Sequence, residues 1–224
     1  MQKLKLSQRT IQILKNFSTI NPSVHIKPGK SIATISSSKS IMAKATIEEE
    51  FESEFAIYDI SRFLSALSLF NEPELAIDKG FATIAEDKKK MNYVFADPKT
   101  IISPPDKRIV MPSQDVEFKL TNDVMSDVNK VVSILRLPEI MVQNSGDKIT
   151  IGASDSKNST SDNFAVEVGE TNNNFRFIFK SENIKTMPGD YDVIISAKGI
   201  SQFTTTDLTY FIAVESNSNF SNET

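Results

Sequence analysis

The chain has 224 residues, 39% of them hydrophobic and 24% charged, with no Cys and a single His, His25. A chain of this length forms one or two domains. The absence of Cys and the presence of a single His exclude disulfides, thiol nucleophiles, iron–sulfur clusters and zinc sites built on cysteines or several imidazoles. The apolar runs are too short for a signal peptide or a membrane span. We therefore expect a soluble intracellular protein with no membrane association, no resident metal and no cofactor.

Charge is distributed unevenly along the chain. The formal net charge is −4, yet residues 1–47 contain eight basic residues and no Asp or Glu, and an acidic run follows at residues 48–50. Charge runs usually mark solvated surfaces, which is how we interpret the acidic run. For residues 1–47, a surface that contacts an anion is an equally good interpretation, because every acid is excluded from a long segment.

The first half of the chain predicts two helices and a set of strands. Ser7 is a suitable N-cap for a helix whose apolar residues Ile11, Leu14 and Phe17 recur at helical spacing. The opposite side of this helix is polar and free of acids, with Gln8, Arg9, Gln12, Lys15 and Asn16. The further expected elements are a hairpin at 24–35, strands at 41–47 and 51–58, a helix at 59–70, a hairpin at 75–85 and a strand at 91–96.

Residues 97–115 interrupt this pattern. They contain four of the nine prolines and no Gly. Because Pro fixes φ and removes a backbone donor, we expect this segment to be extended and stiff. We interpret it as a connector between a first domain at 1–96 and a second domain at 116–215.

The second half repeats the order of the first. Residues 119–122 (KLTN) match residues 5–8 (KLSQ) at an offset of 114, and Ile134 falls where Ile20 fell. After a helix capped by Thr121, the expected elements are a hairpin at 140–151, strands at 163–168 and 175–179, a short helix at 181–187, strands at 191–197 and 209–214, and a flexible tail at 216–224. The internal duplication predicts an α+β protein of two similar domains, each a β-sheet backed by two helices.

Catalytic motifs are absent from the sequence. It contains no phosphate-binding glycine loop and no Gly-x-Ser-x-Gly motif. His25 has no recognisable nucleophile or orienting acid beside it. Paired carboxylates, such as Asp190 with Asp192, occur in any acidic protein, so an acid-dyad hydrolase is the third-ranked possibility. We expect no enzymatic activity.

A family resemblance extends from about residue 4 to residue 215. It rests on collinear segments: 5–7 (KLS), 14–21 (LKNFSTIN), 56–59 (AIYD), 96–98 (ADP) followed by Pro104, Lys107 and Pro112, 183–191 (NIKTMPGDY) and 197–199 (AKG). Together they closely resemble the sliding clamps of T-even-type bacteriophages, which are DNA polymerase processivity factors. The resemblance implies a homotrimeric ring of two-domain chains, with helices lining the hole, twelve in all, and sheets forming the outer wall.

The resemblance also implies partners and sites. Duplex DNA would pass through the ring, a C-terminal peptide of the DNA polymerase would dock near the connector, and an ATP-dependent clamp loader would open the ring, all in the cytoplasm of an infected bacterial host. The DNA-facing residues would be Lys5, Arg9, Gln12, Lys15, Asn16, Lys119, Asn122 and Lys130. The peptide pocket would be lined by Ile101, Ile102, Val110, Met111, Pro112, Tyr210 and Ile212, although these side chains would equally serve to hold the connector against the domain cores.

Ring closure by the family's edge pairing would join residues 91–95 of one subunit to residues 163–168 of the next. The alternative from another class is a β-rich structural virion component. Such a protein would share the Cys-free, strand-rich composition but would have no reason to repeat a polar, basic helix side after 114 residues.

Overall fold

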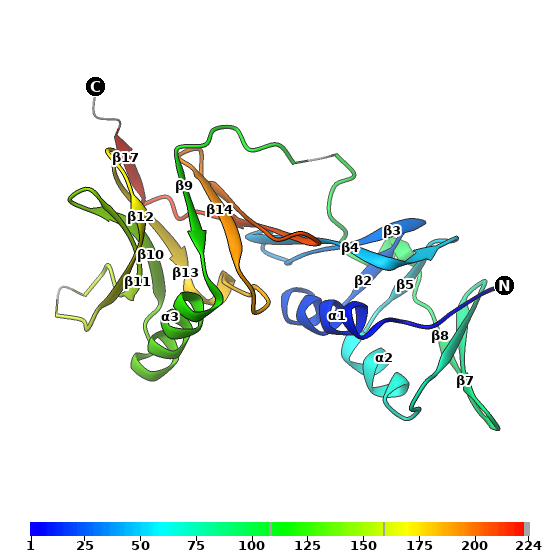
Figure 1. Cartoon of the computed structure of the whole chain (residues 1–224). Helices are drawn as coiled ribbons and strands as arrows, with labels where there is room; N and C mark the ends of the chain where they lie inside the picture. Colours follow the sequence, from blue (N-terminus) through cyan, green and yellow to red (C-terminus); the bar gives the residue numbers. More distant parts are fainter. Residues whose placement is uncertain (108, 159, 222–224) are drawn as a thin grey trace. The chain divides into compact units, whose positions relative to one another are not determined.

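The computed structural model describes residues 1–107, 109–158 and 160–221. The chain divides into two compact units, residues 1–107 and residues 108–224, each combining antiparallel strands with helix (Figure 1). The described residues contain three α-helices, two in the first unit and one in the second. Of these helices, none is both long enough and apolar enough to cross a membrane.

Two helices of the first unit pack against each other, α1 (Gln8–Ile20) and α2 (Ile60–Leu67). Each begins at a side-chain cap: the Ser7 hydroxyl and the Asp59 carboxylate accept hydrogen bonds from first-turn backbone N–H groups at 3.2 and 2.9 Å. Helix α2 ends three residues earlier than predicted, because the chain after Leu67 tightens into i→i+3 hydrogen bonds. The buried side of α1 consists of Thr10, Ile13, Leu14, Phe17 and Ile20.

The strands of the first unit form antiparallel sheets. The larger sheet consists, in spatial order, of β1 (Gln2–Leu4), β6 (Glu74–Asp78), β7 (Phe81–Glu86) and β8 (Lys89–Val94). Two further pairs are β2 (Val24–Ile26) with β5 (Phe55–Ile57), and β3 (Gly29–Ile35) with β4 (Ile41–Phe51). Strand β4 continues without a break through the acidic run where the sequence predicted a gap, and β1 was not predicted.

The second unit has one helix, α3 (Asn122–Leu135), which packs across three strands of a five-stranded sheet. That sheet consists, in spatial order, of β12 (Phe164–Glu170), β11 (Lys148–Ser154), β10 (Glu139–Ser145), β13 (Asn174–Lys180) and β17 (Asn219–Ser221). A second set of strands pairs in the order β9 (Val116–Leu120), β14 (Tyr191–Ser196), β15 (Ile200–Thr204) and β16 (Leu208–Ala213). Strands β9 and β15 were not predicted.

The helix predicted at residues 181–187 is a three-residue 3₁₀ turn, Ser181–Asn183. Two tyrosines explain the difference. The backbone N–H of Met187 donates to the Tyr210 hydroxyl at 3.1 Å, and the Tyr191 hydroxyl donates to the Met187 carbonyl at 2.7 Å. Side chains thus satisfy backbone groups that a helix would have paired, and Pro188 prevents continuation. The expectation of two α-helices in each half is therefore wrong for the second unit, while the α+β class is confirmed.

The predicted flexible tail is wrong for residues 219–221. These residues form β17, which pairs with β13, and the Phe220 ring stacks beside Phe177 with ring centroids 6.1 Å apart. One aromatic side chain gives this polar segment apolar surface to bury, which the composition of residues 216–224 conceals. The last three residues of the predicted tail, 222–224, lie outside the described residues.

Candidate nucleic-acid interface

Helix α1 presents a row of exposed polar side chains opposite its buried side. Gln8, Gln12, Lys15 and Thr19 are exposed, and steps of four, three and four residues keep them on one side of the helix. With a rise of 1.5 Å per residue, the row is about 16 Å long. It contains one positive charge and no acid, which suits an anionic partner.

The exposed row lies part of a turn around the axis of α1 from the polar side that the sequence predicted. Gln12 and Lys15 lie in the row, whereas Arg9 and Asn16 are half-buried at its flank. The sequence centred the apolar stripe on Ile11, Leu14 and Phe17. Leu14 and Phe17 are buried as predicted, but Ile11 is half-exposed, and Thr10 and Ile13 are buried as well. The polar side therefore turns toward Lys15. The sequence already placed Gln8 on the polar side, although not among the DNA-facing residues, and full use of the helical period would have added Thr19.

An acid from strand β4 holds the start of α1. The Glu49 carboxylate accepts hydrogen bonds from the backbone N–H of Ser7 and from the Thr10 hydroxyl, the second at 2.6 Å. A carboxylate in this position stabilises the positive end of the helix dipole. Glu49 lies 42 residues from Ser7 in the sequence, so only the fold reveals the contact.

Lys5, just before α1, is less available to an external anion than Lys15. Its ammonium lies 3.1 Å from the Glu72 carboxylate. The same loop donates the backbone N–H groups of Asn71 and Glu72 to the Glu86 carboxylate, at 3.1 and 2.6 Å. These hydrogen bonds hold the pKa of Glu86 below its usual range, so its negative charge persists near Lys5.

The two predicted lysines of the second unit each have an acidic neighbour. Lys119 lies on β9 rather than on the helix, and its ammonium is 4.0 Å from the Asp192 carboxylate. Lys130 lies on α3 and is 2.9 Å from the carboxylate of Asp127, three residues before it. Both lysines are exposed, but a phosphate would have to compete with these carboxylates for them.

Asn122, the third predicted residue of this unit, holds a loop in place. Its side-chain oxygen accepts a hydrogen bond from the backbone N–H of Gly189 at 3.0 Å. Its own backbone N–H donates to the Asp190 carboxylate at 2.8 Å, which places an acid at the start of α3 as Glu49 does at the start of α1. The side-chain oxygen of Asn122 is thus already occupied by a hydrogen bond from this loop.

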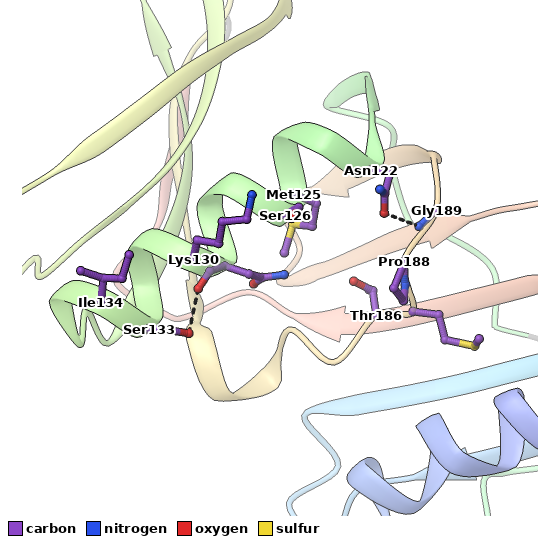
Figure 2. A pocket seen from close by; sticks show the side chains of 11 residues that line it. Asn122, Met125, Ser126, Lys130, Ser133, Ile134, Thr186, Pro188 and Gly189 are labelled. Carbon is purple, nitrogen blue, oxygen red and sulfur yellow. Dashed lines mark hydrogen bonds between the residues drawn. The ribbon is translucent and has the colours of Figure 1, made fainter.

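A groove of about 620 Å³ runs between α3 and the loop at residues 186–189 (Figure 2). Its helix side carries the polar residues Ser126, Asn129 and Ser133 beside Lys130, and the Ser133 hydroxyl donates to the Asn129 carbonyl at 2.9 Å. Among the groove residues the sequence pointed to Asn122 and Lys130 but not to Ser126, Asn129 and Ser133, because it predicted a helix where the loop forms the other side of the groove. The groove residues are Asn122, Met125, Ser126, Asn129, Lys130, Ser133, Ile134, Thr186, Met187, Pro188 and Gly189.

The connector's apolar residues divide into buried and exposed. Ile101 is 8% exposed and belongs to a core, whereas Ile102 is 51% and Val110 is 76% exposed; Met111 is half-buried and Pro112 exposed. Residue 108 lies outside the described residues. The exposed members are the ones whose surface a peptide could cover.

The first unit holds its end of the connector by polar contacts. The side-chain amide of Asn21 donates to the carbonyl of Ile102 at 3.4 Å. Lys27 forms an ion pair with Asp106, and this contact lowers the pKa of the Asp106 carboxyl.

Tyr210 and Ile212 do not belong to an accessible pocket. Both have 0% exposure, and the Tyr210 hydroxyl is engaged by the backbone N–H of Met187. Alternate residues of a strand point to opposite faces, and the half-exposed face of β16 carries Thr209 and Phe211. The prediction chose the buried face of this strand, because a short apolar run gives no sign of which face is covered.

Comparison with known proteins decides the family. Residues 5–103 match the family described as DNA polymerase processivity factor, and residues 117–216 match the family described as gp45 sliding clamp, C terminal. The sliding clamp of Vibrio phage KVP40 is 35% identical over 220 residues, which cover 95% of this chain and 99% of that protein. The sliding clamps of Escherichia phage RB69 and Enterobacteria phage T4 are each 30% identical over 225 residues, 96% of this chain and 98% of theirs.

The chain belongs to the sliding clamp family. This clamp chain is thus a polymerase processivity factor, and none of the relatives named above is a virion component, so the alternative has no support among them.

Solved structures show that the clamp fold extends far beyond sequence similarity. A PCNA from A. fulgidus, solved with the C-terminal region of FEN-1, superposes with a TM-score of 0.73 at 11% identity and covers 98% of this chain and 100% of its own. PCNA from Entamoeba histolytica gives a TM-score of 0.70 at 12% identity, covering 95% and 98%. A DNA polymerase III beta chain from Streptococcus pneumoniae gives 0.68 at 11% identity, and the match spans 96% of this chain and 65% of that longer chain.

Proposed function

We propose that three copies of this clamp chain close a ring around duplex DNA and hold a DNA polymerase on its template. The observation that carries the proposal is the exposed, acid-free row on α1 in a chain whose net charge is −4. An acidic protein that keeps one polar and basic helix side can attract phosphates there and repel DNA elsewhere. Domains at 1–96 and 116–215, joined by a connector at 97–115, remain part of this proposal.

A ring that slides needs weak contacts that do not depend on sequence. Lys15 supplies a charge on a flexible side chain, and Gln8 and Gln12 supply amide donors. Such groups contact phosphates without reading bases. The Thr19 hydroxyl donates to the Asn16 carbonyl at 2.7 Å, so it adds polarity to the row but no donor for a phosphate. Because a closed ring cannot leave DNA sideways, processivity comes from topology, and strong contacts would only slow sliding.

We assign the remaining predicted DNA-facing residues a smaller contribution to DNA binding. Lys5, Lys119 and Lys130 keep acidic neighbours, and Asn122 uses its side-chain oxygen within its own unit. Arg9 and Asn16 would act from the flank of the α1 row. Three described α-helices in each of three chains would place nine α-helices in the ring instead of twelve.

The partners of the ring follow from its surfaces. We assign the exposed connector residues Ile102 and Val110, with Met111, as the anchor for a C-terminal peptide of the polymerase, since apolar anchors are the usual means of peptide capture. Loading falls to a separate ATP-dependent clamp loader, because this sequence has no phosphate-binding loop. The chain itself is proposed to catalyse nothing and to act in the cytoplasm of the infected bacterial host.

Primer extension on a long circular single-stranded template tests the proposal. With the phage polymerase, its loader and ATP, the chain should convert short products into full-length ones, and omission of the loader should abolish the effect. Light scattering should give three chains per particle at the working concentration. Short products in the presence of all components, or hydrolysis of ATP by the purified chain alone, would contradict the proposal.

A further inference from the structure

The connector ends on a network of hydrogen bonds within the second unit. The backbone N–H of Asp115 donates to the Ile195 carbonyl of β14 at 3.0 Å, and its carbonyl accepts from the Asn173 side-chain amide at 3.2 Å. Its carboxylate accepts from the backbone N–H of Ala197, in the turn between β14 and β15, at 2.7 Å. The residue that precedes β9 is thus held through its N–H, its carbonyl and its side chain.

Two hydroxyl groups extend this network back into the connector. The Ser113 hydroxyl donates to the Asp115 carboxylate and lies 2.6 Å from the Ser196 hydroxyl. Because the Ser113 proton is already used, Ser196 must be the donor to Ser113, and its own oxygen accepts from the backbone N–H of Lys198 at 3.1 Å. Ser196 has 0% exposure, so Ser113 is the acceptor that keeps a buried hydroxyl satisfied.

Ser113 lies close to the apolar residues of the connector and is joined to them by stiff backbone. Val110 is 76% exposed, Met111 is half-buried, and Pro112 follows them. Proline fixes its own φ and restricts the residue before it to extended conformations. The orientation set at Ser113 is therefore passed on to Met111 and Val110.

The other end of the connector is held independently, by the first unit. The Asn21 amide donates to the Ile102 carbonyl, and the Ser103 hydroxyl lies 3.4 Å from Nδ1 of His25. These contacts involve no residue of the Asp115 network. Ile102 therefore serves as an internal reference, because a change at Ser113 should leave its setting intact.

We infer that Ser113 and Asp115 are positioning residues for the polymerase's C-terminal peptide, since they hold Val110 and Met111 in the orientation that receives it. This inference rests on the proposed function and specifies how part of its peptide anchor is kept in place. A peptide that meets an ordered anchor binds without the entropic cost of ordering that segment. Neither positioning residue needs to touch the peptide.

Peptide binding by single variants is the first test. S113A and D115A should each weaken binding of a labelled C-terminal peptide about three- to tenfold in fluorescence anisotropy, because the peptide must then order the connector. S113T keeps the hydroxyl and should restore the affinity. The matched control S181A removes a hydroxyl that donates to the Leu137 carbonyl at 3.2 Å in the same unit, and should leave the affinity unchanged.

The affinity of the folded chain is the readout that a merely structural role would not move. Loss of a hydroxyl hydrogen bond lowers the melting temperature whether or not the hydroxyl positions the anchor. Binding is therefore measured well below the melting temperature of each variant. A lower melting temperature with unchanged peptide affinity in S113A and D115A would overturn the inference.

A double-variant cycle tests the route from Ser113 to the anchor. In the V110S/M111S background S113A should have no further effect on peptide affinity, because the side chains that it positions are gone. In the I102S background S113A should keep its full three- to tenfold effect, because the first unit holds Ile102 separately. Equal effects of S113A in both backgrounds would overturn the inference.

The outcomes separate this inference from the proposed function. If I102S and V110S/M111S weaken peptide binding while S113A and D115A do not, the positioning role is overturned and the peptide anchor stands. If none of these variants changes the affinity, the anchor and the inference are both overturned. Primer extension decides separately whether the chain supports processive synthesis.

Discussion

The two units hold their principal helices in different ways. In the first unit α1 packs beside α2, and Ile20 near its end is 7% exposed. In the second unit α3 faces the loop at 186–189 across a groove, and Ile134, at the matching position of the duplicated pattern, is 76% exposed. The helix with a helical neighbour buries its last apolar residue, whereas the helix beside a loop leaves the matching residue in solvent. The duplicated pattern therefore specifies a helix twice but two different surfaces.

The largest effect expected from this difference is on stability. Ile20→Ala should lower the free energy of unfolding by about 2–4 kcal/mol, because it removes a buried side chain and leaves a cavity. Ile134→Ala should change it by less than about 0.5 kcal/mol. Urea unfolding followed by circular dichroism measures both. Equal losses would mean that a partner covers Ile134 in solution and that the contrast between the units is false.

The connector offers a second matched pair within two adjacent residues. Ile101→Ser should cost about 2–3 kcal/mol of stability, because it places a hydroxyl in a core and removes a buried side chain. Ile102→Ser should leave the melting temperature unchanged and weaken binding of the polymerase's C-terminal peptide about tenfold. Calorimetric melting and fluorescence anisotropy with a labelled peptide separate the two. Unchanged peptide affinity in Ile102→Ser would remove this residue from the proposed anchor.

The acids at the two helix starts provide a third comparison. Glu49→Gln should cost about 1 kcal/mol, because the carboxylate accepts two hydrogen bonds at the start of α1. Asp190→Asn should cost only a few tenths, because the exposed Asp190 accepts one hydrogen bond from the backbone of α3. Thermal melts at low and high salt would show both losses, and the salt dependence should be weaker in the variants. A larger loss for Asp190→Asn would reverse the proposed order.

The two helices should also differ in their contribution to DNA binding. Lys15→Gln should lower the salt concentration at which processive synthesis fails, since one phosphate contact per chain is lost, and each contact changes the slope of log affinity against log salt by about 0.9. Lys130→Gln should have a smaller effect, because Asp127 already competes for this lysine. Primer extension over a range of KCl concentrations checks both. If both variants lost processive synthesis at the same KCl concentration, the two units would contribute equally to DNA binding.

The smallest effects concern pH, and they have opposite signs in the two units. The pKa of Glu86 is lowered by backbone hydrogen bonds, so its contribution to stability is present above the ordinary pKa of Glu and is lost as the pH falls through the lowered value. The pKa of Lys148 is raised by its hydrogen bond to Glu170, so its contribution is present below the ordinary pKa of Lys and is lost as the pH rises through the raised value. Glu86→Gln should weaken the dependence of the melting temperature on pH in the acid range, and Lys148→Met should weaken it in the alkaline range. A variant that melts with the same pH profile as the unchanged chain would refute the corresponding assignment.

The helices and most hairpins could be predicted because their signals are local. Ser7 and Thr121 cap the helices as the spacing of polar and apolar residues suggested. The helix at 181–187 could not be predicted as absent, because two tyrosine hydroxyls from β14 and β16 take up the backbone groups of Met187. Similarly, β17 forms because Phe220 meets a ring that lies more than forty residues away in the sequence. Long-range side-chain contacts overrule local propensity in both places.

The candidate site divides in the same way. Sequence alone determined the family, the duplication, the helix that carries the polar row, and the concentration of positive charge in residues 1–47, since these depend on residue order and composition. Only the tertiary structure decided which basic side chains of the two units lack an acidic neighbour and which apolar side chains stay exposed. Folding brings Glu72 to Lys5 and Asp192 to Lys119, and it buries Tyr210 while it exposes Ile102. The physical reason is that helical and strand periods follow from neighbours along the chain, whereas the partner of a charge and the cover of an apolar side chain come from residues that only folding brings close.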